Sequence, residues 1–93
     1  MIKFRPEDCL VLLVDDVSQN LQLALEILNS AGYATIFASS VKQAIERVKT
    51  ANPDLILLDL MMPEMGGIEV CKRLKSDNLY AHIPIIFVTD SNK

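Results

Sequence analysis

The sequence predicts an α/β domain built on a parallel β-sheet, and three observations support this fold class. Short apolar runs, typical of strands buried on both faces, alternate with segments of helical periodicity. The connections between them are short, and a repeated strand–helix–strand order of this kind favours parallel strands with right-handed helical crossovers. At 93 residues and 51% apolar composition, the chain can form one small domain with an aliphatic core.

The first predicted strand is the run "LVLLV", Leu10 to Val14, which ends in two acids. The helix that follows, "SQNLQLALEILNSAG", has Ser18, or another of its early polar residues, as the predicted N-cap and Gly32 as its stop signal. Its apolar residues recur at steps of three and four: Leu21, Ala24, Leu25, Leu28 and Ala31.

The second predicted strand is "ATIFA", Ala34 to Ala38, and a second helix follows it. Ser40 and Gln43 have the S-x-x-Q spacing of a capping box, and Asn52-Pro53 ends the helix. The apolar face of this helix is predicted to be Val41, Ala44, Ile45, Val48 and Ala51. The third strand is the run "LILL", Leu55 to Leu58, which leads directly into Asp59.

A third helix is predicted from about Gly67, with Ile68, Cys71 and Leu74 on one stripe. Pro84 then introduces the fourth strand, "IIFV", which ends at Thr89.

Charge and composition argue against several classes of function. The net charge is −3 and the basic residues are dispersed, whereas nucleic-acid binding needs a basic stripe. No apolar run approaches the roughly 20 residues of a membrane span, and "MIKFRPEDCL" lacks the features of a signal peptide. We therefore expect a cytoplasmic domain, in which the lone Cys9 and Cys71 act as small buried apolar residues.

Polar residues gather at the predicted carboxyl ends of three strands. These are Asp15 and Asp16 after the first strand, Asp59 after the third, and Thr89, Asp90 and Ser91 after the fourth. Binding sites of parallel sheets form outside the carboxyl ends, so these groups meet if the three strands are neighbours. Any one of these acids alone would usually be a solvated loop residue, but their co-occurrence at the correct ends favours function.

Crowded carboxylates repel one another, so such a cluster either keeps protons or recruits a cation. Oxygen ligands suit a hard divalent ion, above all Mg²⁺, and His82 stands alone, which argues against a soft-metal site.

Three segments that together span nearly the whole chain resemble the receiver domain of two-component response regulators, in particular those of bacterial hybrid kinases and multidomain regulators. They are "VLLVDD" (Val11 to Asp16), "PDLILLDLMMPEMGG" (Pro53 to Gly67) and "PIIFVT" (Pro84 to Thr89). The resemblance implies a flavodoxin-like parallel sheet of strand order 2-1-3-4-5 with helices on both faces.

The resemblance also implies a role for individual residues. Asp59 matches the aspartate that accepts a phosphoryl group from a histidine kinase or a phosphotransfer protein. Asp15 and Asp16, with Asp59 and the backbone carbonyl of Met61, match the Mg²⁺ ligands. Thr89 matches the hydroxyl that binds the phosphoryl oxygen. Pro63 and Gly66-Gly67 match the loop that shapes the floor of the pocket.

The chain departs from the family pattern in two respects. The family continues with a helix, a strand ending in a lysine and another helix, so residues 1–93 match a receiver domain without its last α-β-α portion. Strand 85–88 would then be an exposed apolar edge, and we expect a homodimer through that edge or through the uncovered sheet face. In addition, Asp90 follows the hydroxyl where the family has a small residue, and its charge would repel phosphate.

The sequence is compatible with two other functions. One is a degenerate receiver that binds partners without being phosphorylated. The other is a phosphatase-like hydrolase with an aspartyl nucleophile, although such enzymes carry a D-x-D pair and Met61 stands at its second acid. The leading prediction is a signalling domain whose only catalysis is its own phosphoryl transfer and dephosphorylation. A dinucleotide-binding site is not predicted, since no G-x-G-x-x-G follows the first strand.

Overall fold

The structure, a computed structural model, describes residues 5–16, 18–59 and 66–88. Within this part of the chain, all the predicted strands and helices form at nearly the predicted positions. A short 3-10 helix, Pro6–Asp8, precedes them. The elements are β1 (Leu10–Val14), α1 (Ser18–Ser30), β2 (Ala34–Ala38), α2 (Val41–Ala51), β3 (Leu55–Asp59), α3 (Gly66–Lys75) and β4 (Ile85–Val88).

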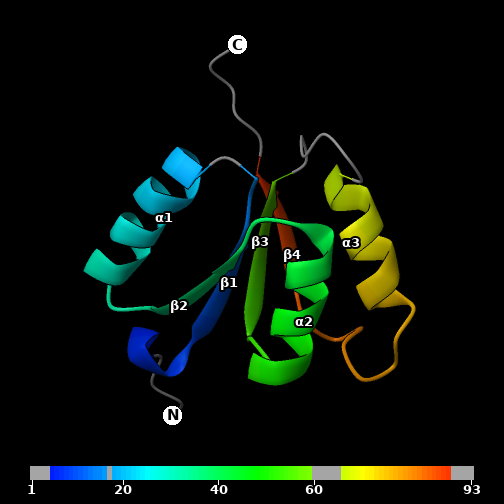
Figure 1. Cartoon of the computed structure of the whole chain (residues 1–93). Helices are drawn as coiled ribbons and strands as arrows, with labels where there is room; N and C mark the ends of the chain where they lie inside the picture. The colour runs from blue at the N-terminus through cyan, green and yellow to red at the C-terminus, as the bar shows by residue number, and fades with distance from the viewer. Residues whose placement is uncertain (1–4, 17, 60–65, 89–93) are drawn as a thin grey trace.

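The four strands form one parallel sheet in the order β2-β1-β3-β4. This order agrees with the flavodoxin-like arrangement expected from the resemblance. It also meets the condition set for the predicted site, because β1, β3 and β4 are consecutive neighbours. Figure 1 shows their carboxyl ends converging at the top of the view. The sheet therefore brings together the strand ends that carry the candidate residues.

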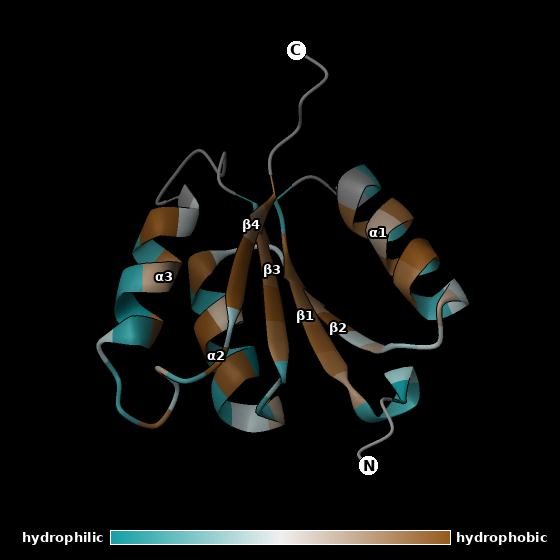
Figure 2. Cartoon of the chain, turned by 180° about the vertical axis from the view of Figure 1, so that it is seen from behind, coloured by the Kyte–Doolittle hydropathy of each residue, from teal (hydrophilic) through white to brown (hydrophobic). Residues whose placement is uncertain are grey.

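Helices cover both faces of the sheet, as expected. Helix α1 lies on one side, and α2 and α3 lie together on the other (Figure 1). The main core fills the space between the sheet and the α2–α3 pair, and Figure 2 shows the strands as largely hydrophobic ribbons. Its buried members are Leu12, Val14, Ala38, Val41, Ala44, Val48, Ile56, Leu58, Val70, Leu74 and Ile83. Strand β1 is buried on both faces, because every residue from Val11 to Val14 is buried.

Helix α1 ends where the sequence predicted, at a glycine-dependent cap. Gly32 has a φ of 95°, in the left-handed region that glycine adopts without strain. The Gly32 amide donates to the Asn29 carbonyl at 3.0 Å, and the Tyr33 amide donates to the Leu28 carbonyl at 3.1 Å. This pair of bonds is the Schellman pattern, which satisfies the last carbonyls of the helix.

Helix α2 begins at the predicted cap, with one difference. The Ser40 hydroxyl accepts a hydrogen bond from the Gln43 amide, as predicted. The Gln43 side chain, however, accepts from the amide and hydroxyl of Ser39 instead of reaching the Ser40 amide. The reciprocal half of the capping box is thus shifted by one residue, because Ser39 offers two donors to the same oxygen. At the other end, Asn52 caps the helix in the left-handed conformation.

The prediction for α3 was right about Leu74, which is buried, but wrong about Ile68. Ile68 was expected on the buried stripe, yet it is 50% exposed. The buried line is Gly67, Val70 and Leu74, with Cys71 half-buried beside it. The helix also begins at Gly66, so the two glycines lie in its first turn and not in the preceding loop. The physical reason is that Gly67 has no side chain and can lie directly against β3.

Within residues 5–16, 18–59 and 66–88, strand β4 is an apolar edge, as predicted. Among the described residues it pairs with β3 alone. Ile86, Phe87 and Val88 are 50%, 39% and 47% exposed, so side chains on both faces of the strand reach solvent. Cys9 and Cys71 were expected to be buried but are only half-buried, and both are free thiols. A search of the described helices finds none with the length and apolar character needed to cross a bilayer.

Candidate functional site

The candidate site lies at the carboxyl ends of β1 and β3. Val14 pairs in register with Leu58, so Asp15 and Asp59 come at the next position of two neighbouring strands. The Asp15 amide donates to the Ala38 carbonyl at 3.1 Å, which ties the end of β1 to the end of β2. Asp59 is the last residue of β3 and pairs in register with Val88 of β4. Backbone pairing thus fixes where both acids leave the sheet.

The structure brings the three predicted acids together. One carboxylate oxygen from each of Asp15, Asp16 and Asp59 lies within 4.8 Å of the other two. Within residues 5–16, 18–59 and 66–88, this is the one group of three or more such side chains that could hold a metal ion. The co-occurrence that the sequence suggested is therefore a real cluster in space.

The three acids differ in burial in a graded way. Asp59 is the most enclosed, at 9% exposed, Asp15 is half-buried, and Asp16 is exposed. Two unit charges 4 Å apart interact by about 1 kcal/mol in water and by about 4 kcal/mol at the effective dielectric of a protein surface. Repulsion among three carboxylates at these separations therefore favours binding of a cation. The gradient leaves Asp16 on the side from which solvent and ligands approach.

The donor set fits a hard divalent ion. All three groups are carboxylates, which suit Mg²⁺ and Ca²⁺ better than softer transition metals. Mg²⁺ commonly takes one or two carboxylates and keeps several waters, which a partly exposed cluster permits. The residues present therefore fit the ion that the sequence predicted.

Helix α3 packs against the end of β3 that carries Asp59. Gly67 is buried, and a Cβ atom built on it would lie 2.7 Å from the Asp59 backbone oxygen. The first turn of α3 thus rests on the residue that supplies the deepest acid. The family resemblance implied that these glycines help to form the pocket, but not that Gly67 contacts Asp59. A glycine at the start of a helix, eight positions after an acid at a strand end, was the available signal.

The remaining predicted site residues, Met61, Pro63, Thr89 and Asp90, lie outside the described residues. Their assignments therefore stay predictions from the sequence.

The chain matches a known protein family over most of its length. The family model described as the response regulator receiver domain matches residues 11–93. The Brucella ovis polar-differentiation response regulator DivK is 40% identical over 79 residues, which is 85% of this chain. The chain spans 64% of the length of that relative.

Solved structures of the same class resemble the fold closely. The N-terminal domain of a response regulator receiver protein from Methanoculleus marisnigri JR1 has a TM-score of 0.82 at 34% identity, covering 85% of this chain and 64% of its own. The Vibrio cholerae chemotaxis protein CheY4 has a TM-score of 0.83 at 30% identity, covering 91% of this chain and 71% of its own. Sequence, sheet order and relatives agree: the chain belongs to the response regulator receiver domain family, whose members serve two-component signal transduction.

Proposed function

We propose that this domain accepts a phosphoryl group on Asp59 from a histidine kinase or a phosphotransfer protein, in a reaction that depends on Mg²⁺. The observation that carries the proposal is the three-acid cluster at the carboxyl ends of neighbouring parallel strands, on a fold of the receiver family. Asp15 and Asp16, with Asp59 and the Met61 carbonyl, are the proposed ligands of the ion. Residues 1–93 are proposed to act as one receiver unit.

The chemistry requires little from the protein beyond positioning and charge. An Asp59 carboxylate oxygen attacks the phosphorus of a phosphohistidine, a P–O bond forms, and the P–N bond breaks. The imidazole nitrogen leaves with the electron pair, and an acyl phosphate remains on Asp59. Because nucleophile and phosphoryl group are both anionic, a bound Mg²⁺ supplies charge neutralisation. Asp15 and Asp16 would hold that charge close to the Asp59 oxygen, because the three carboxylates lie within 4.8 Å of one another, and backbone pairing holds Asp59 at the carboxyl end of β3.

Thr89 and Asp90 are proposed to act on the phosphoryl group in opposite ways. The Thr89 hydroxyl would bind a phosphoryl oxygen, whereas the Asp90 carboxylate would repel it. Asp90→Ala should then raise the phosphorylated fraction of the chain. A lower fraction in Asp90→Ala would contradict this role for Asp90.

A second candidate is a receiver that binds partners without being phosphorylated. Exposed side chains on both faces of β4 favour an interaction role for this strand. We propose that the partner there is a second copy of the chain, paired antiparallel through β4 across a two-fold axis, because a closed symmetric contact covers both open edges at once. Ile86→Glu should abolish this association in light scattering or sedimentation. A wild-type chain that stays monomeric at tens of micromolar, a rough range for weak association, would contradict the dimer.

One experiment separates the two candidates. The purified chain is incubated with acetyl phosphate and Mg²⁺, and the intact mass is measured. The phosphoacceptor proposal expects one added phosphoryl group, none in Asp59→Asn, and an unchanged level in Asp54→Asn. Asp54 is a matched control, because it is an acid at the opposite end of the same strand. No modification of a folded, Mg²⁺-binding wild-type chain would favour the unphosphorylated module.

A further inference from the structure

We infer that Gly67 is a positioning residue of the acid cluster: its missing side chain allows α3 to rest on the Asp59 backbone, and this contact sets where the Asp59 carboxylate lies. The inference deepens the proposed function, since it concerns the geometry of the same site. It assigns a role to a residue that offers no ligand atom of its own.

The contact is closer than any other residue type would allow. A Cβ atom on Gly67 would lie 2.7 Å from the Asp59 carbonyl oxygen, 3.4 Å from the Asp59 carbonyl carbon and 3.1 Å from Leu58 Cγ. Cβ atoms in proteins essentially never come within 3.0 Å of a non-bonded heavy atom. The nearest obstacle is backbone, so a change of side-chain rotamer cannot relieve the clash.

Space, and not backbone conformation, is what requires glycine here. Among the described glycines, Gly32 is the one with a positive φ, whereas Gly67 lies in the first turn of α3 without one. An alanine at position 67 would therefore suit the helix locally and would even favour it by its intrinsic propensity. The alanine would be unfavourable because its Cβ atom would clash with the end of β3.

The rest of α3 limits how the clash can be relieved. Val70 and Leu74, on the same line of the helix, are 0% and 2% exposed and belong to the main core. They resist a movement of the whole helix away from the sheet, because interiors are close-packed. The strain therefore concentrates at the first turn of α3 and at Asp59, the last residue of β3.

A displacement of the Asp59 backbone would act directly on the cluster. The carboxylate oxygens of Asp15, Asp16 and Asp59 lie within 4.8 Å of one another, and a cation bound among them depends on that spacing. Changes in the groups that orient metal ligands commonly reduce metal affinity by about 10–100-fold. We expect Gly67→Ala to weaken Mg²⁺ binding by about tenfold or more.

The test compares Gly67→Ala with Gly32→Ala, which makes the same chemical change elsewhere. Gly32 lies in the turn before β2, at the amino end of the sheet, and its positive φ makes alanine there strained. Mg²⁺ affinity is measured by calorimetry, and melting temperature is measured without metal. Gly32→Ala should melt at a lower temperature and keep the wild-type Mg²⁺ affinity. Gly67→Ala should lose Mg²⁺ affinity, and its metal-free amide NMR spectrum should shift at Asp59 and its β3 neighbours.

Each outcome is decisive. A folded Gly67→Ala chain with wild-type Mg²⁺ affinity and unchanged Asp59 shifts would overturn the inference. If Gly67→Ala does not fold, the wild-type chain is tested instead. Mg²⁺ should then shift the amide NMR signals of the first turn of α3, and unshifted signals there would overturn the inference. If the wild type binds no Mg²⁺, the proposed metal site fails, and the metal-free shifts at Asp59 still test the positioning role separately.

Discussion

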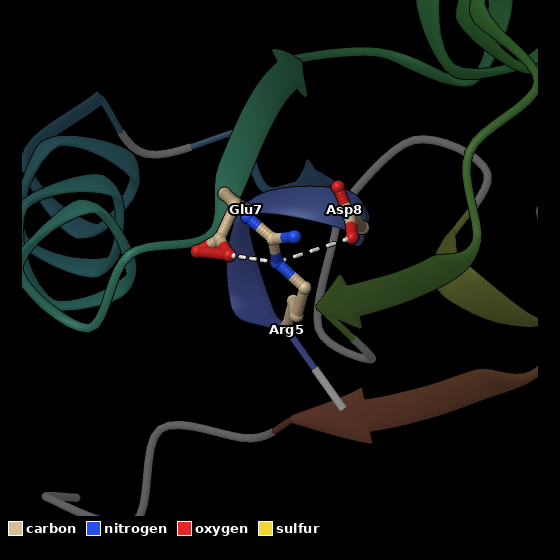
Figure 3. Close-up of polar contacts among 3 residues, drawn as sticks. All are labelled: Arg5, Glu7 and Asp8. Atoms are coloured by element: carbon tan, nitrogen blue, oxygen red, sulfur yellow. Dashed lines mark hydrogen bonds and ion pairs between the residues drawn. The ribbon is translucent and has the colours of Figure 1, made fainter. Parts of the chain in front are cut away.

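Both ends of the sheet carry acidic residues, but the groups that surround these acids differ between the two ends. At the amino end, the Asp54 carboxylate accepts a hydrogen bond from the Leu10 amide at 2.8 Å, and the Asp54 amide donates to the Leu10 carbonyl at 2.8 Å. Nearby, Arg5 Nε lies 2.9 Å from Glu7 Oε1 and 3.7 Å from Asp8 Oδ2 (Figure 3). At the carboxyl end, Asp15, Asp16 and Asp59 gather with their oxygens within 4.8 Å of one another.

This difference shows that an acid at a strand end is not a functional signal by itself. Asp54 faces a backbone donor and joins β1 to β3, so its role is structural. The oxygens of the three acids at the carboxyl end lie within 4.8 Å of one another, and the repulsion between these charges favours binding of a cation. The distinction between the two ends depends on which groups each carboxylate faces, and it can be tested end by end.

The largest expected effect is stabilisation by Mg²⁺ through the carboxyl end alone. At a concentration 100 times the dissociation constant, binding adds about 2.7 kcal/mol to the free energy of unfolding. For a domain of this size, that corresponds to a rise in Tm of roughly 10–20 °C. Asp59→Asn should lose most of the rise, and Asp54→Asn should keep it. Thermal melts over a Mg²⁺ titration measure this. Equal shifts in the wild type and in Asp59→Asn would remove the difference between the two ends.

The next effect is loss of the contact between Asp54 and β1. Asp54→Ala removes the acceptor of the Leu10 amide and should lower the free energy of unfolding by about 1 kcal/mol, since water can partly replace an exposed hydrogen bond. The measurement is urea denaturation in the presence of a chelator. Glu7→Ala is the control, because its ion pair with Arg5 is exposed and is worth about 0–1 kcal/mol. A larger loss in Glu7→Ala than in Asp54→Ala would contradict the structural role of Asp54.

A smaller effect of the opposite sign is expected at Asp59 when no metal is bound. Asp59→Asn removes one of three clustered charges while keeping the shape of the side chain. The metal-free variant should therefore unfold at the same or at a slightly higher urea concentration than the wild type. Destabilisation comparable to that of Asp54→Ala would mean that the Asp59 charge supports the fold, as acids at the amino end do.

The smallest effect concerns Cys9, which lies beside Asp54. Burial, and then the negative charge of Asp54, raise the pKa of the Cys9 thiol above its ordinary value. The pKa of this thiol is higher in the folded chain than in the unfolded chain. Its contribution to the free energy of unfolding is therefore fully present below the unfolded-state pKa and is lost as the pH rises through the folded-state pKa. Thiol alkylation against pH, in a Cys71→Ala background, should show a midpoint above the usual cysteine range. Asp54→Asn should move it only part of the way back, since burial remains.

Much of this molecule could be predicted from local patterns in the sequence. The run from Leu10 to Val14 predicted a strand buried on both faces, and the structure buries Val11 to Val14. Gly32 and Ser40 marked helix ends correctly, because capping depends on backbone conformation and on a side chain a few residues away. The acids of the site could be predicted because a parallel sheet sends every strand's carboxyl end to one edge.

Contacts between distant segments were decided only by the tertiary structure. Spacing alone placed Ile68 on the buried stripe of α3 together with Leu74. In the structure Gly67 approaches the Asp59 backbone, Val70 and Leu74 are buried, and Ile68 is exposed. The hydrogen bond between Leu10 and Asp54 joins residues 44 positions apart, so no pattern within one element indicates this partner of Asp54. Periodicity and capping report interactions within one element. How a helix is rotated on a sheet, and which partner a carboxylate meets, depend on the packing of elements that are remote in sequence.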